Sequence, residues 1–284
     1  MLDFFTSPGI GKETAKALLA HNATVYLAAR NENKTKQAIA DLKQETGKEG
    51  IFLELDLSDL RSVKRAAEEY LRQGHDLHVL FNNAGVMGPP IDHLTKQGYD
   101  AQFGTNVLGH FYFTKLLLPA LLRGAKSSPD GKARVVNTSS STSLLVNGVD
   151  FNTFKDSPAR LRYSSRTLYS QSKLGNVLFS NALARRYGDK GIVSTSLNPG
   201  NLDSEIRRHG VSWGRRMIGP LILYPSPLGA LTQLWAGTSS EGATLNGKYL
   251  IPWARVGNRP NPAGYDEKLQ DDLWDWMEEQ VKDL

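Results

Sequence analysis

Leu77-His78-Val79-Leu80-Phe81 is an apolar segment that leads directly into Asn82-Asn83-Ala84-Gly85. The first stretch has the composition of a buried strand, and the small and polar residues after it are typical of a strand end. Short apolar runs of this kind alternate with helical patterns on both sides. We therefore expect an α/β fold, a doubly wound parallel sheet covered by helices on both faces in three αβα layers.

The other expected elements are short apolar runs and longer periodic segments. The expected strands are 24–29, 51–55, 133–137, 192–197 and 248–251, and the expected helices are 33–46, 58–72, 100–123, 168–187 and 266–281. Ser58 is a candidate cap for the helix that runs to about Arg72. No repeat or linker interrupts the chain, so we expect one domain over residues 1–284.

Composition excludes several classes of function. The net charge of +5 comes from 34 basic and 29 acidic residues scattered along the chain, which does not indicate nucleic-acid binding. Cysteine is absent, which excludes disulfides and thiolate catalysis and fits a reducing compartment such as the cytoplasm. The six histidines show no metal-binding spacing, so no metal is expected.

Residues 217–237 are uncharged and long enough to cross a bilayer, but Pro220, Pro225 and Pro227 would break a spanning helix. We expect no membrane span. Residues 203–237 are instead predicted to form a lid over a small-molecule substrate, with a helix near 227–236. The apolar lid residues are Trp213, Met217, Ile218, Leu221, Ile222, Leu223 and Tyr224. They indicate a lipophilic substrate, although packing of the lid on the core would explain them equally well.

Gly9-Ile10-Gly11 precedes a strong helical pattern over residues 12–19. Glycines at a helix start let a phosphate approach the backbone N–H groups at the positive end of the helix dipole. A plain glycine turn is the alternative. The next strand ends in Ala28-Ala29-Arg30, without the carboxylate that selects NAD(H). Arg30 suits a 2′-phosphate, so NADP(H) is predicted over NAD(H) unless Arg30 is simply a surface residue.

Two further strand ends offer cofactor contacts. Asp56 could accept a hydrogen bond from an adenine amino group, or it could cap a helix together with Ser58 and Asp59. The small residues around Asn83, Ala84 and Gly85 would let a cofactor lie against the sheet edge, whereas a plain turn is the competing explanation.

Tyr169 is followed by Lys173 four residues later, a spacing that places both on one face of a helix. A phenol has a pKa near 10, and a neighbouring ammonium lowers that pKa. The pair is therefore a candidate general acid/base for an alcohol or a carbonyl. A hydroxyl from the stretch 138–141, after the strand that ends at Asn137, could hydrogen-bond a carbonyl oxygen. Composition alone does not choose among these hydroxyls.

Together these motifs resemble the short-chain dehydrogenase/reductase family, and in particular its retinol-dehydrogenase-like branch common in fungi. They occur in family order and spacing from Gly9 to about Ser204. The matching stretches are Gly9-Ile10-Gly11-Lys12-Glu13-Thr14, Leu55-Asp56-Leu57, Asn82-Asn83-Ala84-Gly85, Thr105-Asn106-Val107-Leu108-Gly109-His110-Phe111, Val136-Asn137-Thr138-Ser139-Ser140, Tyr169-Ser170-Gln171-Ser172-Lys173 and Asn198-Pro199-Gly200.

The resemblance implies a Rossmann-like fold and a catalytic role for four residues. Tyr169 would exchange the substrate proton, and Lys173 would hold the nicotinamide ribose and lower the tyrosine pKa. Ser140 would polarise the substrate oxygen, and Asn106 would support a water in the proton relay. The implied cofactor contacts are Gly9, Ile10 and Gly11 at pyrophosphate, Asp56 and Leu57 at adenine, Asn83 at the adenosine ribose, and Pro199, Gly200, Leu202 and Ser204 at nicotinamide.

The amino-terminal end departs from the family pattern. Phe4 and Phe5 stand where the family has Thr-Gly, so a shortened first strand is expected in the centre of the sheet. Unpaired buried backbone groups there would cost about 1–3 kcal/mol each. We expect the chain to begin late and to bind NADPH more weakly than a version extended at this end. Two alternatives to an active enzyme remain: a cofactor-binding protein without turnover, and an inactive truncated product. A homodimer is also left open.

Overall fold

The computed structural model describes residues 2–4, 9–202, 224–258 and 261–284. Its strands are β1 (Leu2–Phe4), β2 (Tyr26–Ala29), β3 (Ile51–Glu54), β4 (Val79–Asn82), β5 (Ala133–Thr138), β6 (Ile192–Leu197), β7 (Tyr249–Ile251) and β8 (Arg255–Val256). Its α-helices are α1 (Ile10–Ala20), α2 (Glu32–Thr46), α3 (Leu60–Arg72), α4 (Ala101–Phe103), α5 (Gly109–Ser127), α6 (Ser165–Tyr187), α8 (Ser226–Thr238) and α9 (Glu267–Val281). A π-helical turn, η1 (Gly104–Leu108), joins α4 to α5, and the 3-10 turns are η2 (Ser141–Leu145), η3 (Phe151–Thr153), η4 (Arg160–Arg162), η5 (Gly188–Lys190), η8 (Glu241–Thr244) and η9 (Pro262–Tyr265).

The strands described form one sheet in the order β3-β2-β1-β4-β5-β6-β7-β8. All neighbours from β3 to β7 run parallel, and only β8 is antiparallel to its neighbour β7. The short strand β1 pairs with β2 on one side and with β4 on the other, which is the central position expected for it. The predicted doubly wound α/β fold is therefore confirmed, and the carboxyl ends of seven parallel strands meet at one edge.

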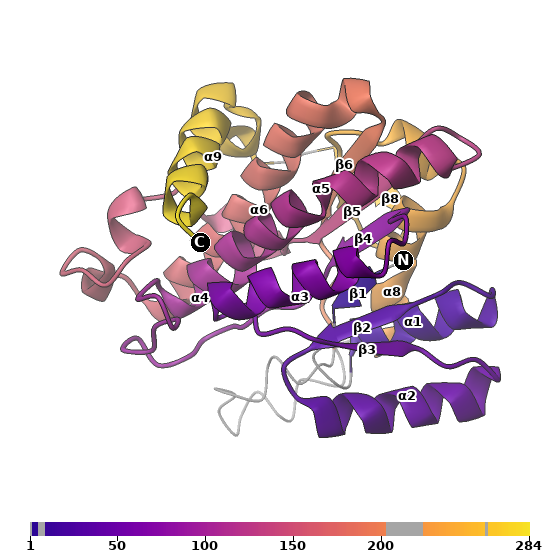
Figure 1. Ribbon diagram of the computed structural model, residues 1–284. Coiled ribbons are helices and arrows are strands. Elements are labelled where there is room, and N and C mark those ends of the chain that lie inside the picture. Colours follow the sequence, from indigo (N-terminus) through magenta and orange to yellow (C-terminus); the bar gives the residue numbers. More distant parts are fainter. Residues whose placement is uncertain (1, 5–8, 203–223, 259–260) are drawn as a thin grey trace.

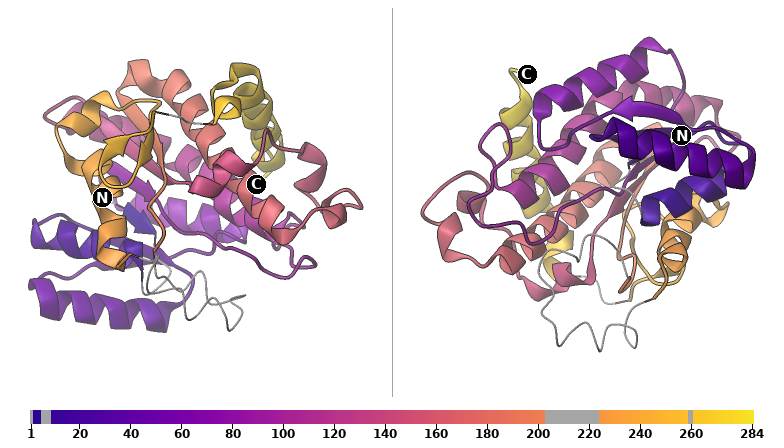
Figure 2. Two further views of the ribbon diagram at one scale, coloured as in Figure 1. Left: turned by 180° about the vertical axis from the view of Figure 1, so that it is seen from behind. Right: turned by 90° about the horizontal axis from the view of Figure 1, so that it is seen from below.

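Helices cover both faces of this sheet in three layers, as Figures 1 and 2 show. Alternate residues of a strand point to opposite faces, so Tyr26 and Ala28 belong to one buried cluster and Leu27 and Ala29 to the other. The first cluster includes side chains from α3, α5 and α6, and the second includes side chains from α1, α2 and α8. Among the described residues, no helix combines the length and apolar composition needed to cross a bilayer.

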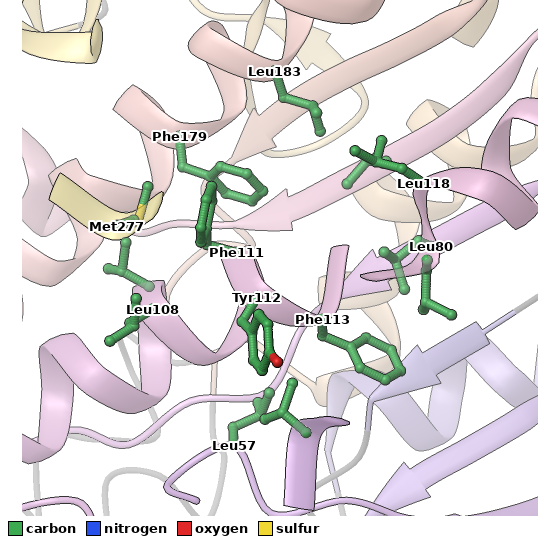
Figure 3. Close-up of a cluster of buried hydrophobic side chains, with 14 of the residues drawn as sticks. Leu57, Leu80, Leu108, Phe111, Tyr112, Phe113, Leu118, Phe179, Leu183 and Met277 are labelled. Carbon is green, nitrogen blue, oxygen red and sulfur yellow. The ribbon is translucent and has the colours of Figure 1, made fainter. Parts of the chain in front are cut away.

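The larger cluster is built around aromatic rings on α5, α6 and α9 (Figure 3). Phe111 contacts Phe179 edge to face with ring centroids 5.8 Å apart, and it contacts Trp274 in the same way at 5.1 Å. Met277 of α9 is also fully buried in this cluster. The helix α9 is therefore packed against α5 and against α6, which carries Tyr169 and Lys173.

Local differences from the sequence-based expectations have simple causes. Asp59, not Ser58, caps α3, and its carboxylate accepts a hydrogen bond from the N–H of Arg61. The helix expected over 100–123 begins after its cap Asp100 and contains the π-turn η1 before it continues as α5. The helix expected near 227–236 is present as α8. Most of the predicted lid, residues 203–223, lies outside the described residues.

Candidate active site

The amino end of α1 lies at the carboxyl edge of the sheet and begins at Gly9-Ile10-Gly11. Gly9 occupies the cap position, where no side chain accepts a hydrogen bond from the first turn. Gly11 is buried. A helix start that lacks a side-chain cap presents backbone N–H groups and the positive end of the dipole to a ligand. This corner is therefore compatible with a phosphate group, and the phosphate contact at Gly9-Ile10-Gly11 stays a prediction.

Gly229 on α8 brings the phosphate corner close to the residues that follow β6. A Cβ atom on Gly229 would lie 2.2 Å from Cδ1 of Leu202 and 2.9 Å from Cγ1 of Ile10. A side chain at position 229 would therefore require Leu202 and Ile10 to shift. Leu202 is buried. The structure brings Ile10 and Leu202 close together, although these two predicted contact residues are almost two hundred positions apart in sequence.

Arg30 and Asp56 follow β2 and β3 at the same edge. Arg30 is exposed, and no carboxylate of the described residues pairs with it. One carboxylate oxygen of Asp56, Oδ1, accepts hydrogen bonds from the N–H and the hydroxyl of Ser58, at 2.9 and 2.6 Å. Asp56 therefore has a turn-stabilising role, and that role leaves its other oxygen for a ligand. Leu57 is buried, and its carbonyl lies against Gly109.

The segment after β4 lies against the candidate catalytic residues. Asn83 is half-buried and Ala84 is buried. A Cβ atom on Gly85 would lie 3.0 Å from Oδ1 of Asn106 and 3.5 Å from Nζ of Lys173. The missing side chain at Gly85 thus leaves room for the two polar groups.

Asn106 is fully buried in the π-turn η1, and its side chain is held on every side. Its Oδ1 accepts a hydrogen bond from the N–H of Val86 at 2.8 Å. Its Nδ2 donates to the carbonyl of Val86 and to Oγ of Ser172, both at 3.0 Å. Asn106 therefore ties the segment after β4 to α6. π-turns inside α-helices occur frequently at functional sites.

His110 was not predicted as a site residue, yet it lies in the first turn of α5, directly after this π-turn. Its Nδ1 donates to the carbonyl oxygen of Asn106 at 2.9 Å. Burial, with a smaller repulsive contribution from Lys173, lowers the pKa of His110 to about 4. The ring is therefore neutral at physiological pH. The signal for it was present in the sequence, because His110 is one helical turn after Asn106.

Tyr169 and Lys173 lie on the same face of α6, as their spacing predicted. Nζ of Lys173 is 5.7 Å from the centroid of the Tyr169 ring, and it donates to the carbonyl oxygen of Thr138 at 2.9 Å. Burial lowers the pKa of Lys173 to about 7. The ammonium and the neutral amine are therefore both populated near neutral pH.

The hydroxyl-rich stretch after β5 divides into buried and accessible members. Oγ of Ser139 is buried and donates to the carbonyl of Lys173 at 2.6 Å. Ser140 is half-buried, and its Oγ accepts a hydrogen bond from the N–H of Thr142 at 3.2 Å. Because its acceptor side is used in this way, the hydroxyl proton of Ser140 is directed elsewhere. The geometry thus favours Ser140 over Ser139 as a donor to a substrate.

A buried polar chain, which no sequence pattern indicated, connects the phosphate corner to Lys173. The hydroxyl of Thr14 donates to the carbonyl of Ile10 at 2.9 Å. Nε2 of Gln233, on α8, donates to that hydroxyl, and Oε1 of Gln233 accepts from the hydroxyl of Thr138 at 3.4 Å. The carbonyl of Thr138 in turn accepts from Lys173. Both halves of the site are therefore linked through α8.

The predicted contacts after β6 are also at this edge. Pro199 is half-buried, and Gly200 has φ of 97°, a left-handed conformation that favours glycine. The N–H of Gly200 donates to Oδ1 of Asn198 at 3.1 Å, and the ring of Trp253 packs where a side chain would be. Ser204 lies outside the described residues.

Comparison with known proteins identifies the family of this chain. Residues 6–152 match the family model described as short chain dehydrogenase. A short-chain dehydrogenase/reductase of Armillaria gallica is 58% identical over 275 residues, which cover 97% of this chain and 87% of that protein. Retinol dehydrogenase 12 of Homo sapiens is 35% identical over 271 residues, 94% of this chain and 81% of that protein.

A crystal structure of a protein from Mycobacterium paratuberculosis shares the fold with a TM-score of 0.74 and 29% identity, and the match covers 99% of this chain and 92% of that one. The family model covers about the first half of the chain, whereas the match to the Armillaria gallica protein and the structural match each cover at least 97% of it. The chain therefore belongs to the short-chain dehydrogenase/reductase family of oxidoreductases and has retinol dehydrogenases among its relatives.

Proposed function

We propose that this protein transfers a hydride between NADP(H) and a lipophilic alcohol, aldehyde or ketone, with Tyr169 as the general acid/base. The observation that carries the proposal is the grouping of Tyr169 and Lys173 with Asn106 and Ser140 at the carboxyl edge of the sheet. Open α/β sheets bind ligands at this edge.

The cofactor would supply the hydride, and the protein would supply orientation and proton transfer. In the reducing direction, the hydroxyl of Tyr169 would give its proton to the carbonyl oxygen as the carbon–oxygen double bond becomes a single bond. The hydroxyl of Ser140 would hydrogen-bond the same oxygen as negative charge develops on it. Lys173 in its ammonium form would stabilise the phenolate left on Tyr169, and Asn106 would hold the segment after β4 in place.

The residues that we propose for cofactor binding fit a dinucleotide. The uncapped start of α1 at Gly9, Ile10 and Gly11 suits the pyrophosphate. Exposed Arg30 suits a 2′-phosphate, and this supports NADP(H) over NAD(H). The remaining proposed contacts are Asp56, Leu57, Asn83, Ala84, Gly85, Tyr169, Lys173, Pro199, Gly200 and Leu202.

Two observations support a lipophilic substrate. Leu144 and Leu145, shortly after Ser140, are 48% and 62% exposed. The relative retinol dehydrogenase 12 is named for a lipophilic alcohol. The direct test is a panel of aldehydes, ketones and alcohols of increasing chain length, assayed with NADPH/NADP⁺ and with NADH/NAD⁺. We expect turnover that favours NADP(H) and rises with chain length. Tight NADPH binding without turnover of any compound would favour a cofactor-binding protein instead.

A further inference from the structure

The backbone of Ser140 is held by an unusually complete set of hydrogen bonds. Its carbonyl oxygen accepts from the N–H of Ser143 at 3.1 Å, from Oγ of Ser143 at 2.7 Å and from the phenol of Tyr249 at 3.1 Å. Its own Oγ accepts from the N–H of Thr142. The preceding residue, Ser139, donates its N–H to the carbonyl of Leu197 on β6 at 2.7 Å.

Tyr249 reaches this carbonyl from another strand. It begins β7, which is separated from β5 by β6. In the register of the sheet, Tyr249 aligns with Ser196 of β6, and Ser196 aligns with Asn137 of β5. The Tyr249 side chain therefore crosses β6, and its phenol reaches the carbonyl of Ser140, three residues after Asn137. The side chain is 4% exposed, and burial raises the pKa of Tyr249 to about 12, so the phenol keeps its proton at all physiological pH values.

The hydrogen bond from Tyr249 is not needed merely to satisfy a buried carbonyl. Ser143 already donates to that oxygen over a shorter distance, and one partner satisfies the main cost of burying a carbonyl group. Both donors of Ser143, its N–H and its hydroxyl, come from the same local turn, so the donor from a distant strand adds a fixed direction. Small displacements of a catalytic group lower rates strongly, so a direction fixed in this way affects catalysis more than stability.

We propose that Tyr249 is a positioning residue that fixes the backbone of Ser140, so that the Ser140 hydroxyl points at the reacting oxygen of the substrate. This role rests on the proposed function. Tyr249 touches neither substrate nor cofactor in this account, and it acts only through Ser140.

The test is a double-mutant cycle in the full chain, with Tyr249→Phe made alone and in the Ser140→Ala background. We expect Tyr249→Phe to lower kcat about tenfold and to leave the Kd for NADPH within about twofold. In the Ser140→Ala background the same change is expected to lower kcat less than about twofold, because the group it positions is gone. Ser140→Thr, which keeps a hydroxyl, should restore the sensitivity to Tyr249→Phe.

Tyr70→Phe is the matched control. Tyr70 is also buried, and its phenol donates to a backbone carbonyl, that of Asp76, at 3.2 Å. This bond lies before the start of β4, at the opposite edge of the sheet from Ser140. We expect Tyr70→Phe to lower the Tm about as much as Tyr249→Phe, while kcat stays unchanged.

The outcomes separate the two claims. Equal effects of Tyr249→Phe with and without the Ser140 hydroxyl, or no effect on kcat at all, would overturn the role of Tyr249 while a loss of turnover in Tyr169→Phe upheld the proposed function. Normal turnover in Tyr169→Phe would overturn the proposed function and the role of Tyr249 with it.

Discussion

Nζ of Lys173 donates a hydrogen bond to the backbone carbonyl oxygen of Thr138, across 2.9 Å of the protein interior. The carbonyl belongs to the last residue of β5, so the hydrogen bond fixes the end of the lysine side chain at the carboxyl edge of the sheet. The lysine is 4% exposed, and a single carbonyl dipole does not replace the water that an ammonium loses on burial. Its pKa falls to about 7 for this reason.

This burial predicts a specific pH dependence of stability. The pKa of Lys173 is about 7 in the folded chain and about 10.5 when unfolded, so between these values only the unfolded chain binds the proton. The free energy of unfolding should therefore rise with pH in this window, by about 1.4 kcal/mol per pH unit. Lys173→Met lacks this contribution. Denaturant titrations of both cofactor-free proteins measure this. The free energy of unfolding of the wild type minus that of Lys173→Met should increase by about 3 kcal/mol between pH 7 and pH 9.5.

The control for this experiment is Lys126→Met, at an exposed lysine of α5. It should follow the wild type at every pH. If Lys173→Met also ran parallel to the wild type, Lys173 would have an ordinary pKa and the described burial would be wrong.

The buried, neutral ring of His110 predicts a loss of stability at acidic pH. Its pKa is about 4 when folded and about 6.5 when unfolded, so the unfolded chain alone takes up a proton as the pH falls through this window. Between pH 6.5 and pH 4, the free energy of unfolding should fall by about 3 kcal/mol more for the wild type than for His110→Asn. Asparagine removes the titrating ring but keeps an N–H donor for the carbonyl of Asn106. Urea unfolding of both proteins, with exposed His93→Asn as control, measures this difference. Superimposable profiles would show that His110 does not titrate as described.

The exposed guanidinium of Arg30 predicts a preference for NADPH over NADH. Hydrogen bonds from a guanidinium to a phosphate contribute about 1.5–3 kcal/mol, so Arg30→Ala should weaken NADPH binding roughly 10- to 100-fold. NADH lacks the 2′-phosphate, and its affinity should stay within about twofold. Calorimetric titration with both cofactors gives the two Kd values, and NADH serves as the internal control. A loss of equal size for both cofactors would place the 2′-phosphate elsewhere.

The sequence predicted the strands well because buried strands in a parallel sheet are short apolar runs with distinct ends. The strand β8 was missed because Arg255 and Val256 are exposed and form only a brief antiparallel pair. The sequence offered Ser58 and Asp59 as caps of α3 and did not decide for Asp59, because neighbouring polar residues are equally good caps by type. The π-turn around Asn106 could not be predicted, since it changes hydrogen bonding without changing the helical pattern.

Local sequence spacing was enough to predict that Tyr169 and Lys173 share one helix face. The predicted set of residues was incomplete where elements far apart in the sequence come together. Gln233 reaches Thr14 and Thr138 from α8, and Tyr249 reaches Ser140 across a whole strand. No local pattern marks such residues, because their partners are set by the packing of the sheet and helices.

The most direct test of the account is the turnover of Tyr169→Phe with NADPH and the best carbonyl substrate of the panel. Phenylalanine keeps the ring beside Lys173 and removes only the proton donor. We predict a loss of kcat of at least about a thousandfold, in the range for general acid catalysis together with the lost hydrogen bond, with the Kd for NADPH within about threefold. A kcat within about tenfold of the wild type would contradict the account, because the proton would then come from another group.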